Sequence, residues 1–531
     1  MQQFFSRSAF YILTLLMVLL TGCKEQKDPS KSGTKEFRFL EADISTIQKG
    51  YKDGTYTVKE VVQAYIDRIN QIDRNGPRLH SIIIINPDAI QIAEKLDKQL
   101  KEGKMRGSLF GIPVLLKDNI DTHDLMPCTG GSRALMNSFP RKDSYVAMKL
   151  REAGAVIIGK ANLSEWANFR GEMSSSGWSG VGGQTKNPYD LSRNPCGSSS
   201  GSGAAVSANL TMVAIGTETN GSIVCPSNAN GIVGIKPTVG LISRSGVIPI
   251  SFTQDTPGPM ARTVKDAAIV LGALTGIDKD DEHTLASKGN SYHDYTKFLN
   301  VNGLKGKRIG LWKETLGKNY KVDSLLKGEI NRMKAMGAVI VEIDKISDPK
   351  VEDWSFQVLL YEYKYGLNKY FTSLGPSAVI KKLEDLIAFN LKDSVELDFS
   401  NQKYLEMAQA KGNLDSPEYK QALASMQKAT REQGIDKVME LNKLDAIIAP
   451  TGSPAWKTDH TNGDSFSLGS SSPAAISGYP AISVPMGEID GLPVGISFFG
   501  RAWSEPLLLE IAYSYEQGTK HRLIPQFSQG Y

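Results

Sequence analysis

The chain has 531 residues, four Cys, six His and a formal net charge of +4. Charged residues make up 22% and hydrophobic residues 40%, which is the composition of a folded protein and excludes a largely disordered chain. Four Cys are too few for a disulfide scaffold of this length, and without a dense basic block nothing indicates a nucleic-acid partner.

The first 22 residues have the pattern of a secretory signal. Arg7 precedes the apolar run 9–20, which is shorter than the ~20 residues that a membrane-spanning helix needs. The run ends in Leu-Thr-Gly-Cys, which resembles the bacterial lipobox and makes Cys23 the expected lipidation site. We therefore expect a signal peptide at 1–22, a polar tether at 23–36, and an exported lipoprotein anchored to a cell membrane on its periplasmic or surface face. A non-lipidated signal or a short anchor is the alternative.

Residues 37–526 form one predicted domain in which strands and helices alternate. Apolar positions at helical spacing predict a helix over 58–74, for which Thr57 and Glu60 form a capping box. Further helices are expected at about 88–101, 204–210, 263–273 and 323–335. Strands are expected at 82–85, 113–116, 155–158, 211–215, 232–235, 308–311, 338–343, 445–448, 481–484 and 494–498. The alternation predicts an α/β fold with helices covering a mostly buried sheet.

Residues 350–441 are rich in Lys, Glu, Leu and Gln and contain no convincing strand. We interpret them as a helical insertion, with a place in the outer helix layer as the alternative. After the tether, no stretch is long and apolar enough to span a membrane.

The 50 Gly exceed the usual share of ~7% and gather with Ser in 171–204. The end of this stretch, CGSSSGSG at 196–203, is typical of a flexible linker in composition. The helix predicted directly after it indicates instead a loop that presents N–H groups and hydroxyls at a helix start. Residues 197–201 also fit a nucleophile elbow centred on Ser199, but none of the downstream His has a distinctive setting.

Two further segments carry candidate chemistry. Ser222 follows Gly221 at the end of a predicted strand, which gives a hydroxyl flanked by successive backbone N–H groups, as an oxyanion hole requires. Lys117 ends the apolar strand 113–116, where partial desolvation favours the neutral amine. Each feature alone is equally consistent with a turn Ser or with a surface Lys whose stem is buried.

Together these segments resemble the three sequence blocks of the amidase signature family. Lys117 lies in GIPVLLKDNID, Ser198 in CGSSSGSGAA and Ser222 in GTETNGSIVCPS. The resemblance extends over about 37–526 and includes GIKPTVGLISRSG, DTPGPMAR, DAIIAPT and GYPAISVPMGEIDGLPVGISFFG in that order. Within the family, NLSEWANFRG, SGWSGVGGQTKNPY and ISFTQDTPGPMAR are most similar to the bacterial peptide amidases.

The resemblance implies a single large α/β/α sandwich with a mixed central sheet and a Ser–cis-Ser–Lys triad. Ser222 would be the nucleophile, Ser198 the proton relay and Lys117, neutral at rest, the final base. The peptide bond between Gly197 and Ser198 would be cis. The implied oxyanion hole consists of the backbone N–H groups of Thr219, Asn220, Gly221 and Ser222. No cofactor is expected, and no metal-binding motif is present in the sequence.

Three positions depart from the family pattern. Many members have Arg two residues after the nucleophile, where this chain has Val224, and the usual Asp-Thr-Gly-Gly-Ser has Glu218 in place of Asp and Asn220 in place of the first Gly. The first change puts in doubt any substrate recognition that depends on the Arg. Cys128, Cys196 and Cys225 are expected to be packed thiols, although export leaves a disulfide open.

The expected function is hydrolysis of a carboxamide C–N bond to an acid and ammonia through a seryl acyl-enzyme, with peptide C-terminal amides as the expected substrates. Alternatives within the family are a fatty-acid or aryl acylamidase and the A subunit of glutamyl-tRNA amidotransferase, against which export argues. An alternative of another class is a catalytically idle solute-binding lipoprotein. The expected partners are a small amide or amidated peptide and, through the lipid alone, a membrane, but no nucleic acid.

Overall fold

The computed structural model describes residues 37–529, which fall into a short unit that ends at Leu40 and a large unit that begins at Glu41. All described helices and strands lie in the large unit. The predicted signal peptide, Cys23 and the tether lie outside the described residues. Among residues 37–529, no helix combines the length and the apolar character that crossing a membrane requires.

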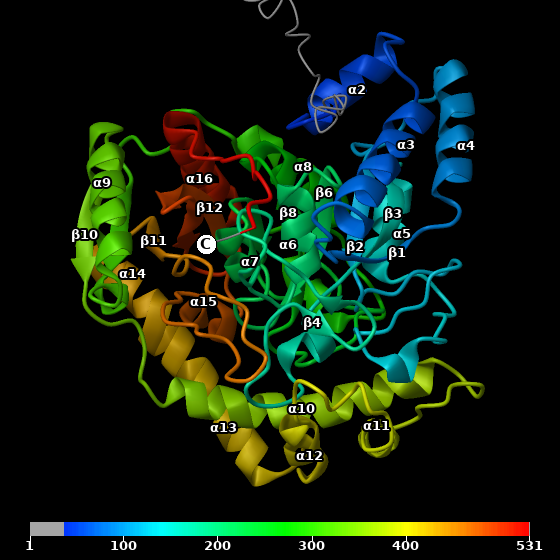
Figure 1. Cartoon of the computed structure of the whole chain (residues 1–531). Coiled ribbons are helices and arrows are strands. Elements are labelled where there is room, and N and C mark those ends of the chain that lie inside the picture. Colours follow the sequence, from blue (N-terminus) through cyan, green and yellow to red (C-terminus); the bar gives the residue numbers. More distant parts are fainter. Residues whose placement is uncertain (1–36, 530–531) are drawn as a thin grey trace, which may run out of the picture. The chain divides into compact units, whose positions relative to one another are not determined.

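The centre of the large unit is a mixed sheet of 11 strands. In Figure 1 it runs from the cyan strands on the right, through green β6 and β8 and orange β12 and β11, to green β10 at the left edge. In spatial order the strands are β1 (Ile82–Ile85), β3 (Val156–Ala161), β2 (Pro113–Lys117), β6 (Val213–Glu218), β8 (Thr256–Ala261), β7 (Val233–Lys236), β12 (Ala481–Ile489), β13 (Leu492–Phe499), β11 (Ala446–Pro450), β9 (Arg308–Trp312) and β10 (Val339–Ile343). A separate ribbon pairs β4 (Trp178–Ser179) with β5 (Gly183–Gln184).

Strand direction decides where the loops emerge. Strands β3, β2 and β6 are parallel neighbours, as are β11, β9 and β10, and antiparallel strands join these two groups. Since β2 and β6 are parallel, their carboxyl ends lie at the same edge of the sheet. Lys117 ends β2 and Glu218 ends β6, so two of the predicted functional segments leave the sheet side by side. The mixed sheet confirms the predicted fold class.

Helices flank this sheet and are capped as the sequence indicates. Thr57 and Glu60 form the predicted capping box at α3, and Val58, Val61 and Tyr65 are buried along one face of that helix. The helices outside the predicted insertion are α2 (Ile44–Lys52), α3 (Val58–Arg68), α4 (Ala89–Lys101), α5 (Tyr145–Glu152), α6 (Ser200–Ser207), α7 (Val224–Ala229), α8 (Val264–Leu274), α9 (Tyr320–Ala335), α15 (Ser472–Ser477) and α16 (Glu505–Thr519).

The stretch predicted to be a helical insertion contains helices and no strand. These are α10 (Val351–Ser373), α11 (Leu383–Asn390), α12 (Lys403–Gln409), α13 (Pro417–Thr430) and α14 (Asp436–Asn442). Figure 1 shows α10 to α13 grouped along the lower edge of the view. Leu360, Tyr363 and Phe371 of α10 share a core cluster with Trp166 and Phe169. The insertion therefore covers the segment that follows β3.

Strand β8 is the one strand of the central sheet that sequence patterns do not predict. Its sequence contains Pro257, Gly258 and Pro259, which are poor strand formers. Both prolines pair with β6, whereas β7 pairs only with Met260 and Ala261 at the other end of β8. This half of β8 thus has a strand neighbour on one side only, which suits residues that lack an N–H donor.

A pair of Gly substitutions tests how tightly the helix after the Ser198 loop packs. A Cβ at Gly201 in α6 would lie 2.2 Å from the carbonyl oxygen of Ser81, whereas a Cβ at Gly328 in α9 meets nothing within 4 Å. We predict that Gly201→Ala lowers the free energy of unfolding by about 1–3 kcal/mol or more through overpacking. Gly328→Ala should raise it by up to about 1 kcal/mol, because Ala is the better helix former. Urea unfolding of both variants measures these free energies. An equal change in the free energy of unfolding in both variants would contradict the close packing of α6 at Gly201.

Candidate active site

Lys117 is fully buried at the end of β2. Its Nζ donates to Ser198 Oγ at 2.7 Å, to Thr217 Oγ1 at 2.9 Å and to the Thr217 carbonyl oxygen at 3.2 Å. Asn119 Nδ2 also donates to Thr217 Oγ1, at 3.0 Å. The two oxygens of Thr217 therefore hold the amine of Lys117 within hydrogen-bond distance of Ser198.

Burial changes the protonation of this amine. Loss of hydration lowers the pKa of Lys117 to about 7, while the carboxylates of Asp255 and Glu218 oppose the shift by attracting the ammonium form. An exposed lysine titrates near ~10.4 and is almost entirely charged at neutral pH. With a pKa of about 7, a large fraction of Lys117 is neutral at physiological pH and able to accept a proton.

Ser198 lies in the loop that precedes α6, and it is buried. The peptide bond between Gly197 and Ser198 is cis, as the resemblance implied. A Cβ at Gly197 would lie 2.2 Å from Ser164 Oγ, so a side chain here would displace the Ser164 hydroxyl. The carbonyl oxygen of Ser198 accepts a hydrogen bond from the Ser164 N–H at 3.1 Å. Ser164 thus packs against both residues of this peptide bond.

Ser199, the candidate for a nucleophile elbow, is engaged with backbone groups. Its Oγ donates to the Thr217 carbonyl oxygen and accepts from the Thr217 N–H, both at 3.2 Å. Its own N–H donates to the carbonyl oxygen of Ser222 at 3.1 Å. Ser199 therefore orders the loop and links it to Ser222, and its hydroxyl is not paired with a base.

Ser222 lies between β6 and α7, with 9% of its surface exposed. Gly221 before it has a φ of +85°, a left-handed conformation that favours glycine. Lys117 is thus joined to Ser198 by a direct side-chain hydrogen bond. Ser222 contacts the same loop through the hydrogen bond between its carbonyl oxygen and the Ser199 N–H.

The turn that leads into Ser222 leaves a row of backbone donors uncommitted. Within residues 37–529, the N–H groups of 219–222 donate to no protein acceptor. The next two, those of Ile223 and Val224, both donate to Glu218 Oε2, at 2.8 Å and 2.9 Å. The buried carboxylate of Glu218 therefore fixes the start of α7 while the preceding donors stay available, which is what an oxyanion hole needs.

Val224, which stands where many family members have Arg, belongs to an apolar cluster with Ile447, Ala474 and Phe499. Only 2% of its surface is exposed. This position therefore contributes packing and offers no charge to a substrate.

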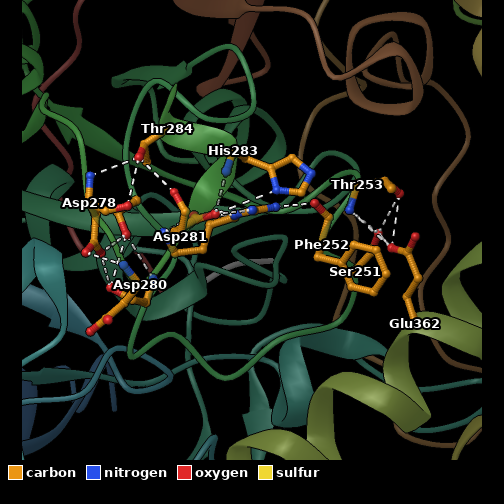
Figure 2. Close-up of polar contacts among 12 residues, drawn as sticks. Ser251, Phe252, Thr253, Asp278, Asp280, Asp281, His283, Thr284 and Glu362 are labelled. Carbon is orange, nitrogen blue, oxygen red and sulfur yellow. Dashed lines mark hydrogen bonds and ion pairs between the residues drawn. The ribbon is translucent and has the colours of Figure 1, made fainter. Parts of the chain in front are cut away.

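A polar chain that sequence reasoning missed supports the turn from behind. Thr219 Oγ1 donates to Asp255 Oδ1 at 2.6 Å, and Asp255 Oδ2 accepts from the N–H groups of Ile250 and Ser251. Figure 2 shows that Ser251 is in turn directed at Glu362 of α10, whose Oε2 accepts from its hydroxyl at 2.5 Å. Asp255 lies in the DTPGPMAR block and could have been suspected, whereas nothing in the sequence marks Glu362.

The acidic residues in the same view are bonded within the protein. Asp278 Oδ2 accepts from Ser243 Oγ at 2.6 Å, and Asp281 Oδ1 pairs with Arg244 at 2.5 Å (Figure 2). Among residues 37–529, no group of three or more His, Cys, Asp or Glu side chains could hold a metal ion.

The expectation that Cys196 and Cys225 are thiols is wrong. They form a disulfide, with their Cα atoms 5.9 Å apart, whereas Cys128 is a buried free thiol. The residues are 29 positions apart in sequence, and the fold brings them together because the Ser198 loop and α7 lie side by side. Sequence alone gives no such proximity.

Comparison with known proteins agrees with this geometry. The family model described as Amidase matches residues 60–509. The "Probable amidase" of Arabidopsis thaliana is 41% identical, with 99% of each chain covered. The crystal structure of the native peptide amidase from Stenotrophomonas maltophilia is 47% identical and superposes with a TM-score of 0.89, covering 93% of this chain and 100% of that one. The A subunit of the glutamyl-tRNA(Gln) amidotransferase from Thermosynechococcus vestitus is 35% identical over 88% of this chain and 96% of its own.

The chain therefore belongs to the amidase signature family. It is a hydrolase that acts on amide C–N bonds.

The pKa of Lys117 predicts the pH dependence of hydrolysis. Since the neutral amine is the form that can accept a proton, kcat should rise about tenfold per pH unit well below pH 7 and level off above it. A kcat profile between pH 5 and pH 9 measures this, with folding checked by tryptophan fluorescence at each pH. A rate that is constant over this range while the protein stays folded would show that no group with this pKa takes part.

Proposed function

We propose that Ser222, Ser198 and Lys117 form the catalytic triad of this amidase and that its substrates are peptides with a C-terminal amide. The observation that carries the proposal is the 2.7 Å hydrogen bond between the fully buried Lys117 amine and Ser198 Oγ. A buried lysine without an ion-pair partner within hydrogen-bond reach is costly, and it is typical of a site that uses the neutral amine.

In the proposed mechanism, Ser222 Oγ attacks the amide carbonyl carbon while its proton passes to Ser198, and the Ser198 proton passes to neutral Lys117. The tetrahedral intermediate then collapses, the C–N bond breaks, and the proton returns through Ser198 to the leaving ammonia. Water then attacks the resulting ester of Ser222 while one of its protons passes through Ser198 to Lys117. The proton returns through Ser198 to Ser222 Oγ as the ester bond breaks, which releases the acid. Serine is a weak nucleophile until a base takes its proton, so both half-reactions depend on the lysine.

The N–H groups of Thr219, Asn220, Gly221 and Ser222 would stabilise the negative oxygen of the tetrahedral intermediate. Support comes from their freedom from other acceptors among residues 37–529 and from the side-chain contacts that hold the turn in place. Asn220 Oδ1 accepts from Ser471 Oγ at 2.7 Å, and Asn220 Nδ2 donates to Ser472 Oγ at 3.2 Å. Donors that are ordered before the reaction need no reorganisation when charge develops.

Similarity to a peptide amidase supports the choice of substrate. That enzyme is 47% identical over its whole length, which is closer than the 35% identity of the amidotransferase relative. The amidotransferase is named for a transfer RNA, which is found inside cells, whereas the N-terminal sequence of this chain indicates export.

Export and lipid attachment at Cys23 form the second part of the proposal. The lipobox-like sequence at 20–23 motivates it. The disulfide between Cys196 and Cys225 supports it, because such bonds persist in oxidising compartments and are rare in the cytoplasm.

Replacement of the triad tests the assignment. We predict that Lys117→Ala and Ser222→Ala each reduce ammonia release at least about 10³-fold, since the triad acts as a unit. Ser200→Ala is the matched control, because it removes a buried hydroxyl that has no hydrogen-bond partner in the described part of the chain, and it should keep near-normal turnover. Normal turnover in either triad variant would refute the assignment.

Ammonia release from a panel of substrates tests the acyl specificity. We expect amidated dipeptides and tripeptides to give the highest kcat/KM, followed by free amino-acid amides. Anilides and long-chain fatty amides should react at least about tenfold more slowly. A preference for anilides or fatty amides would make the chain an acylamidase instead.

Lipidation is tested by expressing the full chain in bacteria with radiolabelled palmitate. We expect label on the wild type, none on Cys23→Ser, and accumulation of the precursor when the lipoprotein signal peptidase is inhibited with globomycin. An unlabelled mature protein that begins at another residue would show a conventional secretory signal.

A further inference from the structure

We propose that the disulfide between Cys196 and Cys225 is a positioning element for catalysis, which holds Ser198 and Ser222 in register and makes full turnover depend on the oxidised pair. The proposal rests on the roles assigned above to these two serines. It adds a pair of residues that lie outside the proposed triad and oxyanion hole.

The disulfide encloses both serines in one covalent ring. Cys196 precedes Ser198 by two residues, and Cys225 follows Ser222 by three, so the ring of sequence separation 29 contains both hydroxyls near its closure. Motion of the Ser198 loop away from the start of α7 is therefore limited by a covalent bond at the point where the two segments meet.

Only weaker contacts duplicate this link. The Ser199 N–H donates to the Ser222 carbonyl oxygen at 3.1 Å, and Asn230 Nδ2 donates to the carbonyl oxygens of Pro195 at 2.9 Å and Pro226 at 2.7 Å. Each of these hydrogen bonds contributes about 0.5–1.5 kcal/mol net, and unlike the covalent bond it can open and re-form as the loop fluctuates.

Cys196 has a backbone conformation that needs outside support. Its φ is +57°, in the left-handed region that residues with a side chain rarely adopt. Two restraints hold it there: its N–H donates to Asn194 Oδ1 at 2.8 Å, and its sulfur is bonded to Cys225. Such conformations persist only where the surroundings enforce them, so loss of the disulfide frees Cys196 to relax directly before Gly197 and Ser198.

The surroundings of the disulfide protect it from reduction. Cys196 and Cys225 are 4% and 8% exposed, and they share a cluster with Ala229, Ala455 and Trp456. Trp456 Nε1 donates to Asp464 Oδ1, which also accepts from the Ser176 N–H. The disulfide thus packs against the segment of Ala455 and Trp456, which hydrogen bonds hold in place. A reductant reaches the disulfide only when this segment moves away.

The effect on catalysis follows from the precision that proton relay requires. Proton transfer between Ser222, Ser198 and Lys117 requires hydrogen-bond distances between them. A misplacement of these groups by about 1 Å can lower the rate about 10²-fold. Substrate contacts outside the two loops are unaffected, so kcat is expected to fall and KM to change little.

The experiment compares the oxidised enzyme with enzyme reduced by dithiothreitol. Two electrons and two protons pass from the reductant to the disulfide, which gives two thiols in the protein and the cyclic disulfide of dithiothreitol. Complete reduction is verified by mass spectrometry after alkylation, and folding by tryptophan fluorescence. We expect kcat for an amidated dipeptide to fall about 10²-fold with KM within about twofold, and reoxidation with oxidised glutathione to restore it.

Variants separate this effect from other actions of the reductant. The double variant Cys196→Ser/Cys225→Ala should show the same low kcat and no response to dithiothreitol. Cys128→Ser, which changes the buried free thiol, should behave as the wild type in both states. The rate at which a fluorophosphonate labels Ser222 is the second readout, because it needs no knowledge of the natural substrate.

Two outcomes would overturn the proposal alone: equal labelling of Ser222 before and after verified reduction, or a loss of activity that only follows the unfolded fraction. Failure of the oxidised enzyme to label at Ser222 would instead overturn the proposed triad, and this proposal with it.

Discussion

Lys117 ends an apolar strand in the interior of the sheet, where its amine exchanges water for Ser198 Oγ and two oxygens of Thr217. The loss of hydration disfavours the ammonium form and brings the pKa to about 7, against the attraction of two carboxylates. In the proposed mechanism, the resulting balance gives a base that works at neutral pH without histidine. It depends on the parallel pairing of β2 with β6, because this pairing places Thr217 beside the end of the lysine strand.

The two carboxylates that act on Lys117 also order the turn before Ser222. Glu218 accepts from the N–H groups of Ile223 and Val224, and Asp255 accepts from Thr219 Oγ1. The charge near Lys117 and the order of the turn before Ser222 are therefore set by the same groups. Glu362 extends this connection to helix α10 through Ser251, and burial raises its pKa to about 7. Helix α10 of the insertion thus takes part in the hydrogen-bond chain that supports the turn before Ser222.

Local sequence patterns predicted the parts of the fold that local physics decides. The capping box of α3 and the apolar runs of ten strands needed only spacing and residue type. Strand β8 was not predicted because proline is a poor strand former. In the structure, its prolines pair with β6 on one side and with no strand on the other. Lys117, Ser198 and Ser222 were found through family blocks. The disulfide and the contact between Ser251 and Glu362 join residues 29 and 111 positions apart, and such proximity is decided by the assembled fold alone.

In the proposed mechanism, Ser222 carries the acyl group while Lys117 and Ser198 transfer protons. Mass spectrometry of enzyme quenched in acid during turnover of a slowly deacylating ester tests this most directly. We expect an acyl adduct on the peptide that contains Ser222, at near-stoichiometric occupancy in the wild type and strongly reduced in Lys117→Ala. An adduct on Ser198 or Ser199, or full acylation of Ser222 at normal speed without Lys117, would contradict it.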